Sequence, residues 1–309
     1  MLRPVPIPAF ANALALLPLL AAGGPAPAPT NVPLKFAWPA RLRCEVEQKM
    51  TFDVRGGQAP QGTSMRLSLE AARGPDGWQV RQKVLESTPK GKMDPHELEV
   101  LLFPPFKVTK DGAFAGLNLT ADDKAILDKR QAAEDKKAEM AKKLAPNMPS
   151  ILREDLLANA TKRATSAWSF LVAAWAGKEL PPGDVPELRT ARDETLPMLG
   201  PMHVIDHLKI TTGAACSPAP KGGCVRLEIT SSPDPASLPA PGPGAPAGPS
   251  MRDVHFQLTS TLLTDPRTLV PRSVTKVSEV EMPDPDAPAG QKAELKHIQV
   301  VDTTTYRCK

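Results

Sequence analysis

The chain has 309 residues, with 38 Lys and Arg against 34 Asp and Glu and 41% hydrophobic residues. That length suits one large domain or two small ones. A net charge of +4 argues against electrostatic capture of nucleic acid, and 4% aromatic residues argue against base stacking on single strands. We therefore expect no nucleic-acid partner.

The first 24 residues have the composition of a secretory signal peptide. Arg3 is their only charged residue, an apolar stretch runs from Phe10 to Leu20, and small residues follow up to Gly24. The apolar stretch is too short for a permanent membrane-spanning helix. We expect residues 1–24 to be removed on export to the periplasm or the extracellular space, which leaves no transmembrane anchor.

Residues 25–40 are rich in Pro and Ala, which predicts a flexible or polyproline-like leader before a single β-rich domain over residues 41–308. In the clearest strand, over 42–54, apolar side chains alternate with charged ones. This alternation is typical of an antiparallel sheet with one buried and one solvated face. Further strands are predicted at 65–71, 78–84, 97–103, 106–109, 113–119, 204–210, 225–229, 254–262, 273–280 and 294–306.

Residues 120–177 form a helical insertion, because there the apolar spacing changes from two to three or four. The first helix, over 121–144, is rich in Ala, Lys, Glu and Asp and is expected to lie largely in water. The second begins at Ser150 and carries an apolar stripe, which we expect to pack on the sheet. The stripe includes Leu156, Trp168, Leu171 and Trp175. Residues 232–250 contain seven prolines and no apolar period, which predicts a disordered loop.

The four cysteines predict two disulfide bonds, because an exported protein meets an oxidising environment. Cys216 and Cys224 bracket a short loop rich in Pro and Gly, so a bond between them would clamp the mouth of a hairpin. Cys44 and Cys308 then remain for each other, and their bond would place the first and last strands side by side and antiparallel. The alternatives are a redox or metal pair at Cys216 and Cys224, and free buried thiols at Cys44 and Cys308.

One group of ionisable side chains has the character of a metal or catalytic site: His203, Asp206 and His207. On a strand the two histidines share one face, opposite Val204 and Leu208, and no third metal ligand is visible. Zinc needs three or four ligands. We therefore expect no metal and no cofactor, and an enzyme or metal-binding protein that uses these three residues is the less favoured alternative.

The predicted fold class is α+β, mainly β: a large curved antiparallel sheet, or half-barrel, with a two-helix insertion. A signal peptide followed by this organisation over about residues 41–308 resembles the half-barrel of periplasmic lipoprotein carriers. It equally resembles uncharacterised families of secreted bacterial β-rich proteins. In the carrier fold, helices plug a concave sheet that holds acyl chains, so the resemblance implies an apolar ligand or a cell-envelope partner.

The sequence thus favours an exported, non-enzymatic protein that binds an apolar ligand or an envelope partner. A structural or interaction scaffold with a filled core is the alternative. The ligand is expected between the second helix and the concave face of the sheet. Its expected lining is Val46, Phe52, Trp78, Val80, Leu156, Trp168, Leu171 and Trp175.

Overall fold

The alternating segments of the chain form β-strands in a computed structural model. It describes residues 31–54, 60–89, 93–144, 155–185, 191–196, 200–217, 219–220, 223–234, 255–283 and 295–309. The predicted signal peptide lies outside these residues. Of the loop predicted over 232–250, only residues 232–234 are described: the first two end a strand, and the third follows it.

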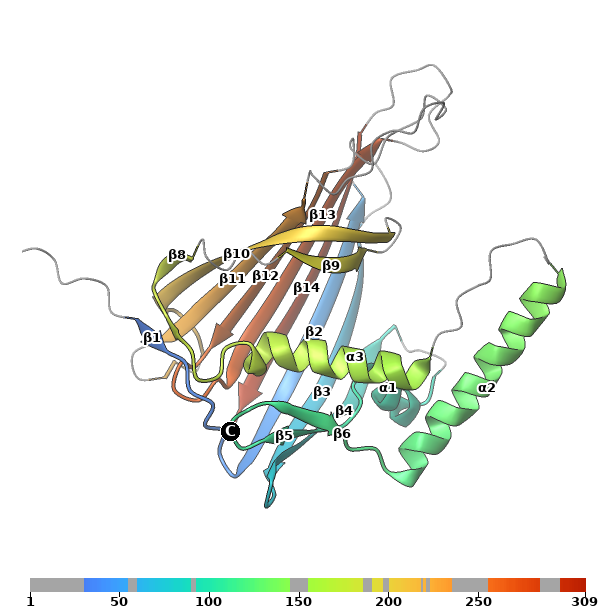
Figure 1. The fold of residues 1–309 in the computed structure, drawn as a ribbon, viewed down its shortest axis with the longest axis horizontal. Coiled ribbons are helices and arrows are strands. Elements are labelled where there is room, and N and C mark those ends of the chain that lie inside the picture. Colours follow the sequence, from blue (N-terminus) through green and yellow to red (C-terminus); the bar gives the residue numbers. More distant parts are fainter. Residues whose placement is uncertain are drawn as a thin grey trace, which may run out of the picture.

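Twelve strands form one open, curved antiparallel sheet (Figure 1). They are β2 (Arg41–Val54), β3 (Gln61–Arg73), β4 (Gly77–Thr88), β5 (Phe106–Thr109), β6 (Phe114–Leu117), β8 (Gly183–Val185), β9 (Ala191–Leu196), β10 (Gly200–Ala214), β11 (Cys224–Pro233), β12 (His255–Thr264), β13 (Pro271–Pro283) and β14 (Leu295–Cys308). The order is β6-β5-β4-β3-β2-β14-β13-β12-β11-β10-β8, and β9 also pairs with β10. The mainly β fold with a curved, unclosed sheet is confirmed.

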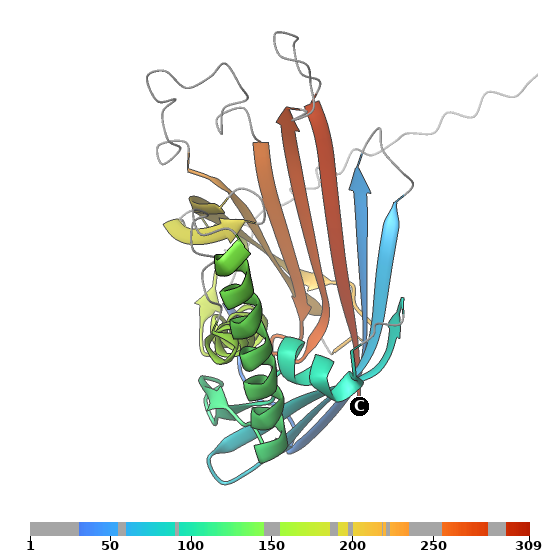
Figure 2. The same cartoon turned by 90° about the vertical axis from the view of Figure 1, so that its right-hand side faces the viewer.

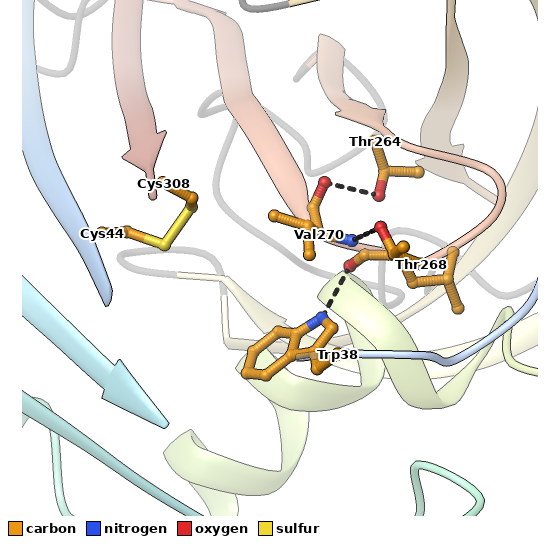
Figure 3. The surroundings of a disulfide bond; sticks show 7 residues. Trp38, Cys44, Thr264, Thr268, Val270 and Cys308 are labelled. Atoms are coloured by element: carbon orange, nitrogen blue, oxygen red, sulfur yellow. Dashed lines mark hydrogen bonds between the residues drawn. A yellow bond between two sulfur atoms is a disulfide. The ribbon is translucent and has the colours of Figure 1, made fainter. Parts of the chain in front are cut away.

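Both predicted disulfide bonds are present. Cys44 and Cys308 lie opposite each other where β2 pairs antiparallel with β14, and a disulfide joins them (Figure 3). The bond between Cys216 and Cys224 closes the hairpin of β10 and β11. The alternative of free buried thiols at Cys44 and Cys308 is therefore wrong.

The helical insertion is confirmed. It contains α2 (Ala121–Leu144), α3 (Leu156–Trp168) and a π-helical turn η1 (Ser169–Ala173) that continues α3. α3 crosses one face of the sheet (Figure 1), and the view turned by 90° shows α2 on the same side of the sheet (Figure 2). We call the face that packs against α3 and η1 the inner face.

A strand was expected over 97–103, and this prediction is wrong because the segment forms the helix α1 (Pro95–Leu102). The Asp94 side chain accepts hydrogen bonds from the backbone N–H groups of His96 and Glu97, and Pro95 occupies the first turn. An acidic cap followed by proline is a strong helix start, and it outweighs the short apolar run that suggested a strand.

The expectation of a flexible leader is also wrong for residues 31–40. β1 (Val32–Pro33) pairs with β7 (Glu179–Leu180), and the next residues enter the core. Leu34 is 1% exposed, and the buried Trp38 indole donates a hydrogen bond to the Leu269 carbonyl in the turn after β12 (Figure 3). Burial of these large apolar side chains stabilises an ordered conformation.

Aromatic rings from distant parts of the chain meet beneath α3. The ring of Trp168 lies 5.1 Å from Trp38, 5.5 Å from Phe106 and 5.9 Å from Phe36, measured between centroids. Phe36 also meets Trp78 edge-on at 4.9 Å. We call these five residues the aromatic cluster. It joins the N-terminal segment, β4, β5 and α3 into one core.

Candidate functional site

The inner face of the sheet changes from buried to exposed along β2. Leu42, Cys44 and Val46 are buried, whereas Met50 and Phe52 are 42% and 45% exposed. Side chains at alternate positions of a strand share a face, so all five lie on the inner face. α3 and η1 therefore cover only the part of this face near the Cys44–Cys308 bond, and the rest is the candidate site.

Two rows of side chains cross the inner face beyond α3, as the strand registers place their members side by side; the first is apolar in half of its members, and the second is apolar throughout. The first row consists of Phe52, Val300, Ser278, Leu258, Ser231 and Asp206. The second consists of Val54, Ile298, Val280 and Phe256, with Val204 packed against Phe256.

Exposure of the two rows falls from β2 toward β10. Phe52 on β2 is exposed, Val300 and Val280 are half-buried, and Phe256 and Val204 are buried. The first part of β10, with β9, lies on the α3 side of the sheet beyond the helix (Figures 1 and 2). The open apolar surface thus lies over β2, β14 and β13. We call it the open inner face.

A polar row separates the open inner face from the core. The registers place Asp302, Lys276 and Ser260 side by side on β14, β13 and β12. The Gln48 amide donates to both carboxylate oxygens of Asp302, each at 3.1 Å. The exposed Lys276 ammonium lies 5.5 Å from the centroid of the Phe170 ring in η1. The row therefore marks the edge of the surface that η1 covers.

The group of His203, Asp206 and His207 does not form one site. Asp206 lies on the inner face, where the buried Ser231 hydroxyl donates to its Oδ1 at 2.5 Å. Both histidines are exposed on the opposite face, as the alternation predicted. Because one sheet separates the carboxylate from the imidazoles, these three side chains cannot bind one ion. Among the described residues no cluster of three metal-ligating side chains occurs.

The eight residues predicted to line a ligand do not share one site in the structure. Six of them are packed into the core, and only Phe52 lies on the open inner face. Leu156 instead lines a cavity of about 390 Å³ between α2 and α3, together with Leu127 and Asp155. The packed residues are Val46, Trp78, Val80, Trp168, Leu171 and Trp175. A binding role for the eight stays a prediction.

The residues of the open inner face that sequence reasoning missed are on β13 and β14. Ile298 lies between the polar residues His297 and Gln299, and Val300 occupies the next alternate position, so both carried a signal for an inner face. Lys276 and Ser278 interrupt the apolar positions of β13, which made that strand read as irregular. An interruption by polar residues on an otherwise apolar face can itself indicate a site where the face is not covered.

A second group of charges lies outside the sheet, between β4, α1 and α2. Asp123, in the first turn of α2, is fully buried and accepts from the Thr120 backbone N–H at 2.8 Å. The Arg81 guanidinium lies 3.4 Å and the His96 ring 3.3 Å from its carboxylate oxygens. A buried carboxylate with these partners caps α2 and ties it to β4 and α1, so its role is structural.

No protein family and no curated protein matches this chain. In the parts of the chain that the structure describes, no helix has both the length and the apolar character needed to cross a membrane. The two disulfide bonds are typical of proteins that fold in an oxidising compartment.

Proposed function

We propose that this protein is exported and non-enzymatic, and that it binds an apolar ligand on the open inner face. The observation that carries the proposal is the continuation of apolar side chains past the helix that covers the rest of the sheet, throughout the second row and at Phe52, Val300 and Leu258 of the first. Phe52 and Met50 are more than 40% exposed there, next to the half-buried Val300. Single exposed apolar residues are normal, but adjacent ones on a curved face are typical of binding surfaces.

The ligand best suited to this surface is a long acyl chain. A strand rises about 3.3 Å per residue, so the surface from Lys276 to Val280 extends roughly 13 Å along β13. Each buried methylene group contributes about 0.8 kcal/mol, so a chain that covers this length is held without any covalent chemistry. The same surface would serve an acyl chain attached to an envelope protein, which fits the resemblance to periplasmic lipoprotein carriers.

Export is supported by two independent features. The first 24 residues have the composition of a signal peptide, and the cysteines form two disulfide bonds. Disulfide bonds persist in secreted and periplasmic proteins and are rare in the cytosol.

A scaffold role is the second candidate, and one observation favours it. Six of the eight residues expected to line a ligand are packed in the core instead, together with the aromatic cluster. A sheet that is filled at one end needs no ligand there for stability. The two candidates differ only in what the open inner face does, and a binding experiment separates them.

The experiment measures binding of Nile red, a neutral apolar dye, to the exported chain and to two variants of β2. Phe52→Asp places a charge on the open inner face, and Thr51→Asp places the same charge on the opposite face of the same strand. We expect dye binding to the parent protein, weaker binding to Phe52→Asp, and no change in Thr51→Asp. No binding to the parent, or equal binding to both variants, would favour the scaffold. Thermal unfolding of each variant verifies that it is folded.

A further inference from the structure

We infer that Phe170 in η1 limits the length of the apolar chain that the open inner face binds, because the tail of the ligand ends against its ring. This inference rests on the proposed function and adds a residue that determines specificity. It also assigns a direction: the chain runs along β13 with its tail toward η1 and its head toward the end of the strand far from the Cys44–Cys308 bond.

The covered part of the inner face ends where α3 and η1 lie across the strands. On β13, Val274 is buried and Lys276, two residues further along the same face, is exposed. On β2, Val46 is buried and Met50 is exposed. The helix crosses the strands instead of following them (Figure 1). A chain that runs along β13 over the open inner face is therefore blocked by the side of this helical segment.

Phe170 is the aromatic residue at this boundary. The Lys276 ammonium lies 5.5 Å from the centroid of the Phe170 ring, so the ring is next to the inner face of β13 at the polar row. The ring is half-buried and packs against the core. A cation is attracted to the face of an aromatic ring, so the contact with Lys276 holds the ring in this position.

The backbone of η1 is fixed on the side of the core. Leu171 and Val172, which follow Phe170, are buried, and the Trp175 indole donates to the Phe170 carbonyl at 2.6 Å. η1 is a π-helical turn, a form that is rare in proteins and frequent at functional sites. With its backbone and its ring both held, Phe170 can act as a fixed limit for a ligand.

The position of the helices determines which end of the ligand meets Phe170. η1 bounds the open inner face at one end, and α2 lies on the same side of the sheet as α3 (Figure 2). Among the described residues, no helix crosses β13 and β14 at the other end (Figure 1). A bulky head group, or a protein attached to it, fits at that other end, so the narrow tail points toward Phe170.

The test uses n-alkyl maltosides from octyl to hexadecyl, whose head is bulky and neutral, each added below micelle formation. Displacement of Nile red reports their affinities for the parent protein, Phe170→Ala, Phe170→Val and Phe114→Ala. Phe114 on β6 is the matched control, because it is also half-buried and packed against the core but lies in the edge strand of the sheet. Thermal unfolding again verifies that each variant is folded.

We expect the affinity for the parent to rise about fourfold with each added methylene until the tail reaches Phe170, and to rise no further beyond that length. In Phe170→Ala the limit should move to a longer chain, so the first maltoside beyond the parent's limit should bind about fourfold more tightly than it binds the parent. Phe114→Ala should keep the parent's limit. If Phe170→Ala does not fold, Phe170→Val supplies the comparison.

The same limit in the parent and in the folded Phe170 variant would overturn the inference while the proposed function stands. An equal shift in Phe114→Ala, or an affinity for the parent that rises over the whole series, would overturn it too. If neither Nile red nor any maltoside binds, the proposed function itself fails.

Discussion

Truncation of Trp168 is the sharpest test of how the sheet, the helix and the N-terminal segment are held together. The Trp168 side chain is 1% exposed, and its ring contacts Trp38, Phe106 and Phe36. Its indole N–H donates to the buried Gly112 carbonyl at 2.8 Å. Trp168→Ala therefore removes both a large core side chain and a hydrogen-bond donor from one place.

The expected loss follows from these two parts. Emptying a large aromatic site typically costs about 3–5 kcal/mol. The buried Gly112 carbonyl also loses its donor, which adds roughly 1 kcal/mol. Trp168→Phe keeps a ring in the aromatic cluster but removes the donor and part of the volume, so it should cost roughly 1–2 kcal/mol.

Urea unfolding measures these losses, and Leu157→Ala on the same helix is the control. Leu157 is 52% exposed, so its truncation should change the free energy of unfolding by less than about 0.5 kcal/mol. A Trp168→Ala protein as stable as Leu157→Ala would refute the reasoning, because the aromatic cluster would then not be a tightly packed core. If Trp168→Ala does not fold, Trp168→Phe still supplies the comparison.

Two further predictions concern the sheet. Replacing Cys44 and Cys308 with Ala should lower the free energy of unfolding in urea by more than replacing Cys216 and Cys224 with Ala, because the first bond closes a much longer loop. The upper limits are roughly 5–6 kcal/mol for the first bond and 2–3 kcal/mol for the second. Equal losses would contradict the dependence on loop length. Burial raises the pKa of Tyr306. The unfolded chain therefore loses the phenolic proton first, and stability should fall above about pH 10 by up to ~1.4 kcal/mol per pH unit. Tyr306→Phe should remove the part of the stability loss above about pH 10 that comes from this phenol. A variant that loses stability with pH as the parent does would contradict the assignment to Tyr306.

The sheet and its closure could be predicted because the relevant signals are local or involve few candidates. Alternation along β2 has period two and is interrupted only at Gln48, and only a few pairings of four cysteines are possible. α1 was missed for a different reason. Its apolar run is as short as a strand, and the start signal at Asp94 and Pro95 received less weight than that run.

The N-terminal segment shows how average composition can hide a core. Residues 25–40 are rich in Pro and Ala, yet Leu34, Phe36 and Trp38 are large apolar residues at alternate positions. Alternate apolar residues predict an extended segment with one buried side, and the structure buries Leu34 and Trp38 accordingly. The spacing of the apolar residues, rather than the average composition of the segment, therefore indicated that it belongs to the core.

The candidate site was predictable in its face but not in its position along the strands. Alternation places Val46 and Phe52 on one side of β2, which the structure confirms. Which of them is covered depends on where α3 docks, and docking is set by contacts with the aromatic cluster from other parts of the chain. For that reason Val46 is in the core while Phe52 is exposed.

The pairing of β2 with β14 governs the order in which this chain can fold. These strands lie in the interior of the sheet but come from opposite ends of the domain, and their cysteines are 264 residues apart in sequence. Loops of that length close late, and contacts between distant segments slow folding. During synthesis or export from the N-terminus, β2 keeps an unpaired edge until β14 arrives. Unpaired edges invite aggregation, so β2 is the strand most open to wrong pairing until the last strand is in place.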